Sequence, residues 1–335
     1  MNLARGLTFA EAAPGEVVDF LRSRRLQEFR VAPQNLHVAN DGTRLILRMY
    51  KGGVSEYPLR EAFLLKLLKW YGFPARHMGR LSIDTVSSIL NDHLLSIKSG
   101  DVTLKVENGE ALSLMSGRYN AISDLDVLEL AKPFGVVSIS RNDFFMRVYT
   151  RIRERIRPVP GDECGMGYNV FNSETGFQAL SVHHFILRYV CSNGAIIQAD
   201  ARKRQCIHYG HPDWLLRDFL KHEMREAWHV RKRIIKSIEE STSRSCRGEI
   251  EETKERLNPI VGKKVTVEAL ASLNETASLY DLSNVVTSLV RTLEIGKRLE
   301  GESLGGELLA GRARDCQPAG MFFSGCPNTS HRATA

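Results

Sequence analysis

Alternating apolar and polar positions in the middle of the chain predict the strands of a central antiparallel sheet. Within residues 145–197, a run with a period of two is followed by two apolar runs, at residues 168–171 and 179–191. The last run is apolar at both parities, which is typical of a central strand covered on both faces. Residues 172–176 are Asn-Ser-Glu-Thr-Gly, and their Asn, Ser and Gly favour a turn between two strands of a hairpin.

Apolar positions at helical spacing predict helices on both sides of this sheet. Ser82 and Ser123 are expected as N-caps, Gly72 and Pro74 as a helix end, and Asn108-Gly109 as a hairpin turn. The predicted helices cover residues 14–29, 59–71, 82–95, 123–130, 212–240, 250–257, 267–273 and 279–299, and further strands cover residues 44–50, 102–106, 111–115 and 136–139. These elements predict an α+β protein with a central antiparallel sheet, helices packed on it and a helical C-terminal third.

The patterns also suggest domain boundaries. Residues 1–40 are expected to form an N-terminal extension, and residues 41–300 one α+β domain whose helical C-terminal part begins near residue 212. Residues 301–335 are rich in Gly, Ala and Ser and show no periodicity, which predicts a disordered tail.

Composition narrows the class of protein. The 335 residues are 43% hydrophobic and 25% charged, as in globular proteins. Without a run of about 20 apolar residues or a signal-peptide core, the chain is expected to be soluble and cytoplasmic, with no membrane partner. A net charge of +7 favours polyanionic partners. The six cysteines have no paired spacing, so no disulfide framework is implied.

Arginine recurs at every second position at the start of the predicted sheet. On a strand these side chains share one face, spaced about 7 Å apart, which suits the spacing of successive phosphates. Guanidinium groups make paired hydrogen bonds to phosphate, and an interleaved tyrosine on that face offers a stacking platform. The alternative is a solvated strand face or a set of internal ion pairs. The predicted nucleic-acid-binding residues of this run are Arg147, Tyr149, Arg151, Arg153, Arg155 and Arg157.

The helix predicted at residues 212–240 carries a second set of basic side chains. Its charge is partly cancelled by Asp218, Glu223, Glu226, Glu239 and Glu240, which favours a solvated amphipathic helix. The uncancelled triplet Arg231, Lys232 and Arg233 is the exception, and we expect it to assist nucleic-acid binding.

Two side-chain groups suggest catalysis, but each has a simpler structural interpretation. Glu174 stands in the predicted turn, where local hydrogen bonding explains the residue types equally well. Cys191 resembles a nucleophile with His183 or His184 as its base, but a cysteine at the end of a buried strand is usually an inert core residue. The Walker A, HExxH, GxGxxG and GxSxG motifs are absent. No catalytic residue or cofactor is therefore predicted.

A compact group of soft ligands follows the sheet. Cys206, His208 and His211 have metal-ligand chemistry, but zinc normally takes three or four ligands, and a partner such as Cys164 would have to arrive through the fold. No metal site is predicted from this group.

Three motifs in order resemble a known family. They are Leu-Ser-Leu-Met-Ser-Gly-Arg-Tyr at 112–119, Phe-Asn-Ser-Glu-Thr-Gly at 171–176 and Leu-Arg-Tyr-Val-Cys-Ser-Asn-Gly at 187–194. The chain thereby resembles, over roughly residues 55–295, the phage/plasmid-like proteins catalogued as domain of unknown function 932. That family occurs in phages, prophages, plasmids and integrated elements and has no established activity. The resemblance implies a mobile genetic element as habitat, together with the family's fold.

The leading hypothesis is a non-enzymatic nucleic-acid-binding protein of a mobile genetic element. Binding or annealing of single-stranded DNA in replication or recombination is the form of this hypothesis that we favour. A homo-oligomer is compatible with it, by fold-level analogy with annealing proteins. The alternative is a protein-interaction module whose basic faces meet an acidic host or phage protein. A weaker hypothesis is an enzyme centred on Cys191, His183 or His184, and Glu174.

Overall fold

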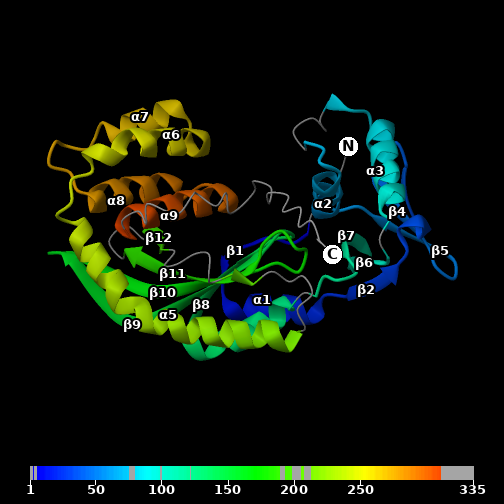
Figure 1. Cartoon of the computed structure of the whole chain (residues 1–335), viewed down its shortest axis with the longest axis horizontal. Helices are drawn as coiled ribbons and strands as arrows, with labels where there is room; N and C mark the ends of the chain where they lie inside the picture. The colour runs from blue at the N-terminus through cyan, green and yellow to red at the C-terminus, as the bar shows by residue number, and fades with distance from the viewer. Residues whose placement is uncertain are drawn as a thin grey trace, which may run out of the picture. The chain divides into compact units, whose positions relative to one another are not determined.

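The computed structural model describes residues 3, 6–74, 80–98, 100–120, 122–188, 193–197, 205–206 and 213–310 (Figure 1). It confirms the α+β class, with antiparallel sheets, packed helices and a helical C-terminal part. The chain forms two compact units. The first comprises residues 1–154, 165–184 and 200–231, and the second comprises residues 155–164, 185–199 and 232–335.

Strands and helices are labelled in chain order. The strands are β1 (Phe9–Ala12), β2 (Leu26–Val31), β3 (Leu36–Asn40), β4 (Leu45–Tyr50), β5 (Val54–Pro58), β6 (Val102–Glu107), β7 (Glu110–Ser116), β8 (Val136–Arg141), β9 (Met146–Val159), β10 (Asp162–Asn172), β11 (Leu180–Arg188), β12 (Asn193–Ile197) and β13 (Gln205–Cys206). The helices are α1 (Pro14–Ser23), α2 (Glu61–Tyr71), α3 (Ile83–Ser96), α4 (Asp124–Ala131), α5 (Asp213–Ser241), α6 (Ile250–Val261), α7 (Lys263–Leu270), α8 (Leu279–Val290) and α9 (Ile295–Ala310).

The central sheet has the strand order β1-β8-β9-β10-β11-β12, and β13 pairs with β11. β8 runs antiparallel to β9, with Ile139 opposite Val148. The predicted turn at residues 172–176 lies between the neighbouring strands β10 and β11, as the hairpin prediction requires. A bulge on β8 between Val136 and Ser138 shifts the register next to β9.

Two smaller sheets, β2-β6-β7 and β3-β4-β5, lie in the first unit. Helix α2 packs against β7 and α3 packs against β3 (Figure 1). The turn between β6 and β7 has positive φ at Asn108 (54°) and Gly109 (82°), the geometry that a type I′ hairpin turn demands. The predicted N-caps are confirmed, because the side chain of Ser82 accepts from the amide of Thr85 and that of Ser123 from the amide of Asp126.

The N-terminal residues are built into the first unit rather than forming a separate extension. β1 pairs with β8, and β2 pairs with β6. Val17 and Leu21 of α1 join a buried apolar cluster of this unit. The helix predicted at residues 14–29 therefore ends at Ser23, because the following residues gain backbone hydrogen bonds to β6 that the local helical pattern did not reveal.

The C-terminal helices differ from the prediction. The helix expected at residues 267–273 begins and ends earlier, as α7 at Lys263–Leu270. The single helix expected at residues 279–299 is divided into α8 and α9, and α9 continues to Ala310. Residues 301–310 are therefore not a disordered tail, and residues 311–335 lie outside the described residues. Gly301 permits close packing of α9 on α8, because a Cβ there would lie 2.3 Å from Cγ1 of Val290. Among the described residues, no helix is long and apolar enough to cross a membrane.

Candidate functional site

The predicted arginine run lies on β9, but its first residues are buried. The exposed fractions of Arg147 and Tyr149 are 3% and 7%. Nε of Arg147 donates a hydrogen bond to Oδ1 of Asn169 on β10 at 2.9 Å. This part of β9 lies between β8 and β10, and both its faces are covered. Arg147 and Tyr149 therefore belong to the interior, which corrects their assignment to a binding surface.

The described arginines in the second half of β9 are exposed, and their charge is partly neutralised. Arg151 is exposed, and the side chains of Arg155 and Arg157 are 64% and 77% exposed. Both Arg155 and Arg157 pair with Glu163 of β10, at 2.9 Å and 3.4 Å. Arg153 belongs to β9, but its side chain lies outside the described residues. The strand thus offers a smaller excess of positive charge than its sequence suggests.

Helix α5 buries one face and exposes the opposite one. Leu220, Met224, Ile234 and Ile238 are at most 5% exposed. Leu220 and Met224 pack in an apolar cluster of the first unit. At about 100° per residue, these four positions lie on one side of the helix. The predicted amphipathic helix at residues 212–240 is thus confirmed.

The opposite side of α5 is strongly basic. At about 100° per residue, its exposed basic and histidine side chains between residues 221 and 236 fall within an arc of about 120°. Fifteen residue steps at 1.5 Å make this surface about 22 Å long. We call it the α5 basic face, and it consists of Lys221, His222, Arg225, His229, Lys232, Arg233 and Lys236. Five of these residues are lysine or arginine and carry a permanent positive charge.

The acidic residues of α5 do not interrupt this face. Glu223 is only 6% exposed and Glu226 is half-buried. Asp218, Glu239 and Glu240 are exposed but lie beyond its two ends. Nζ of Lys236 lies 3.6 Å from Oε1 of Glu240, an exposed pair of the kind worth little. The charge cancellation expected from the sequence therefore acts at the ends of the face and not along it.

The basic triplet Arg231, Lys232 and Arg233 is divided by the helix. Lys232 and Arg233 are exposed on the α5 basic face, whereas Arg231 is half-buried. Consecutive residues of a helix point about 100° apart. This rotation places Arg231 on the same side of α5 as its buried apolar residues. Arg231 is therefore removed from the candidate surface.

Glu174 forms a buried ion pair and is not an exposed turn residue. It is 4% exposed, and Nη2 of Arg24 donates to its Oε1 at 2.6 Å while Nη1 donates to Oε2. The amide of Asp124 also donates to Oε1, at 2.8 Å. Burial by itself would raise the pKa of Glu174, but the hydrogen bonds and charge of Arg24 outweigh it and lower the pKa to about 2.

Further ion pairs surround this one. Glu107 lies 3.1 Å from Arg24, 2.6 Å from Arg60 and 3.4 Å from Arg141, and all four side chains are at most 5% exposed. Burial raises the pKa of Asp124, and the charge of Glu174 adds to that shift. The motif at residues 172–176 is therefore the centre of a buried polar network that supports the fold.

The residues of the enzyme hypothesis are not presented to a substrate in the described part of the chain. His183 and His184 are 4% and 1% exposed and pack against Phe171 and Tyr168. Glu174 is held by Arg24. Cys191 lies outside the described residues.

The metal-ligand group is also largely outside the described residues. His208 and His211 are not described, and neither is the side chain of Cys206 in β13. Cys164 is fully buried, and its Sγ lies 3.4 Å from the hydroxyl of Tyr280. Among the described residues, no group of three or more His, Cys, Asp or Glu could hold a metal ion.

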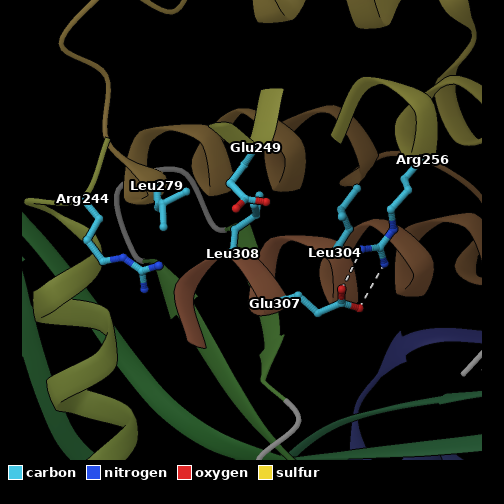
Figure 2. Close-up of a pocket in the computed structure, with 7 residues that line it drawn as sticks. All are labelled: Arg244, Glu249, Arg256, Leu279, Leu304, Glu307 and Leu308. Atoms are coloured by element: carbon cyan, nitrogen blue, oxygen red, sulfur yellow. Dashed lines mark hydrogen bonds and ion pairs between the residues drawn. The ribbon is translucent and has the colours of Figure 1, made fainter. Parts of the chain in front are cut away.

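A small pocket lies among the C-terminal helices of the second unit (Figure 2). Figure 2 shows Arg256 and Glu307 pointing toward each other, and their atoms lie 2.6 Å and 3.0 Å apart. The charges of the two arginines and two glutamates that line the pocket cancel, so its net charge favours neither anions nor cations. Its lining residues are Arg244, Glu249, Arg256, Leu279, Leu304, Glu307 and Leu308.

The chain was compared with protein families, curated proteins and solved structures. No family model matches the chain, and no curated protein or solved structure matches it. The resemblance to the phage/plasmid-like family therefore stays a prediction.

Proposed function

We propose that this chain is a non-enzymatic nucleic-acid-binding protein and that the α5 basic face contacts the phosphate backbone. The observation that carries the proposal is the row of exposed lysine, arginine and histidine side chains on one side of a helix. A phosphate chain releases its condensed counterions when lysine and arginine replace them, and this release drives binding.

The dimensions of the face suit a nucleic-acid strand. Phosphates of one strand recur about every 3.4 Å along a duplex axis, so the face of about 22 Å spans roughly six of them. Arg225, Lys232 and Lys236 lie 7 and 4 residues apart, which aligns them along the helix. The long, flexible lysine and arginine side chains can compensate for differences between their own spacing and that of the phosphates.

The same charge would attract an acidic protein, but the composition of the face favours a polyanionic strand. Protein interfaces are depleted of charged residues, lysine in particular, at their centres and rely on buried apolar anchors. The α5 basic face has five lysine or arginine side chains and no aliphatic residue among its members. Phosphate contacts depend on such cationic side chains.

A salt series tests the proposal. Five phosphate contacts on single-stranded DNA predict a slope of log affinity against log salt of about −3.5, and thus a loss of roughly 100-fold between about 50 and 200 mM salt. We expect the triple variant Arg225→Ala, Lys232→Ala and Lys236→Ala to retain two contacts, with a loss of only about sevenfold over that range. Fluorescence anisotropy with labelled 20-nucleotide strands measures both slopes.

Two variants serve as controls. Lys98→Ala, Lys263→Ala and Lys264→Ala together remove the same charge from exposed sites elsewhere and should leave the slope unchanged. Arg155→Ala with Arg157→Ala tests the exposed end of β9 and should reduce affinity less than the α5 triple variant. An unchanged slope in the α5 triple variant would refute the assignment. A stoichiometric protein partner that survives nuclease treatment, without DNA binding, would favour the interaction-module alternative.

A further inference from the structure

One exposed aromatic side chain lies in line with the α5 basic face. Trp214 is the second residue of α5, and its exposed fraction of 63% is the largest among the exposed Trp, Tyr and Phe side chains of the described residues. It belongs to none of the apolar clusters that the described residues form. An indole exposed at this position offers a flat apolar face to a ligand.

Helical geometry places Trp214 in line with the basic side chains. It precedes Lys221 by seven residues, close to two full turns, so the two side chains point about 20° apart. The separation along the helix is about 10.5 Å, the span of a few nucleotides of a single strand. A strand whose phosphates follow the lysines and arginines would therefore bring a base to the indole.

We infer that Trp214 stacks on an unpaired base and makes the α5 basic face selective for single-stranded nucleic acid. This inference rests on the proposed function. Bases inside a duplex already stack on their neighbours, and only an unpaired base offers its face to a side chain. Base stacking on an aromatic residue corresponds to an affinity gain of about 5- to 150-fold.

Asp218 marks the limit of the phosphate contacts. Asp218 is exposed and follows Trp214 by four residues, about one helical turn, so the two side chains lie on the same side of the helix. A carboxylate at that point repels a phosphate but not the neutral face of a base. The arrangement thus separates a phosphate-binding stretch, from residue 221 onward, from a base-binding position at Trp214.

Three labelled probes of equal length test the inference: a 20-nucleotide oligothymidine, the same strand with abasic sites, and a duplex. The abasic strand retains the phosphates and lacks the bases. We expect Trp214→Ala to weaken oligothymidine binding about fivefold or more and to leave the affinities for the abasic strand and the duplex unchanged. Trp214→Phe, which keeps an aromatic ring, should retain most of the wild-type affinity.

The outcomes separate the inference from the proposed function. If Trp214→Ala binds oligothymidine as well as wild type, or loses affinity equally for all three probes, stacking at Trp214 is refuted while backbone binding stands. If wild type binds none of the probes in a salt-dependent manner, the proposed function itself fails. Thermal unfolding of each variant confirms that the exposed substitution leaves the fold intact.

Discussion

Replacement of Glu174 by glutamine should destabilise the first unit by about 3 kcal/mol. The substitution keeps the shape of the side chain and removes the charge that pairs with buried Arg24. A shift of the pKa from 4.5 to about 2 corresponds to roughly 3 kcal/mol at neutral pH. Removal of one partner from a buried pair typically costs about 3–5 kcal/mol, and Glu107, 3.1 Å from Arg24, offsets part of that cost.

Thermal unfolding followed by circular dichroism measures this loss. For a unit of this size, about 3 kcal/mol lowers the midpoint by roughly 6–12 °C. Glu163→Gln is the matched control, because Glu163 pairs with exposed Arg155 and Arg157 and its loss should cost less than about 1 kcal/mol. Equal effects of Glu174→Gln and Glu163→Gln would refute the argument that burial makes the Glu174 pair strong.

The effect should also depend on pH with a defined sign. The pKa of Glu174 is lower in the folded than in the unfolded chain, so its contribution is complete above pH 4.5 and is lost as the pH falls toward 2. The difference in unfolding midpoint between wild type and Glu174→Gln should therefore shrink from pH 6 to pH 3. Asp124 acts in the opposite sense, because its raised pKa makes ionisation costly as the pH rises. A difference that grows on acidification would contradict this account.

Two further predictions follow from the packing of the second unit. Gly301→Ala should destabilise it by about 1–3 kcal/mol in thermal unfolding, because the new Cβ would lie 2.3 Å from Cγ1 of the buried Val290, whereas Gly248→Ala meets open space and should be neutral. Cys164 should resist iodoacetamide at pH 8 in the native protein and react in urea. Burial raises the pKa of its thiol to about 11, although a hydrogen bond with Tyr280 opposes the shift. Labelling of Cys164 in the native protein, detected by peptide mapping with mass spectrometry, would contradict this prediction.

Several local elements were predictable because their causes lie within a few residues. Ser82 and Ser123 cap helices through amides three positions away, and Asn108 and Gly109 adopt the positive φ angles of their turn. The amphipathic pattern of residues 212–240 likewise specified α5. In each case the deciding interaction is a local hydrogen bond, a backbone preference or a periodic apolar face.

Which charged residues form the proposed binding surface depends on tertiary contacts, which the sequence does not show. The period of two at residues 147–157 correctly predicted a strand, but neighbours in the sheet decided that Arg147 is buried and Arg155 exposed. In the sequence the acidic residues of α5 partly cancel its charge, but Glu223 lies on the packed side of the helix and is buried. A helical projection of the sequence would have shown the basic face, because its angular spread follows from 3.6 residues per turn.

The sequence by itself determined the α+β class, most helices and strands, and the excess of positive charge. Tertiary structure alone decided which charges reach water. Glu174 finds Arg24 across 150 positions of the chain, and the glycines near residue 301 become a packing surface only when α8 lies beside them. Secondary structure follows from periodicity and short-range bonds, whereas exposure depends on which distant segments cover each face.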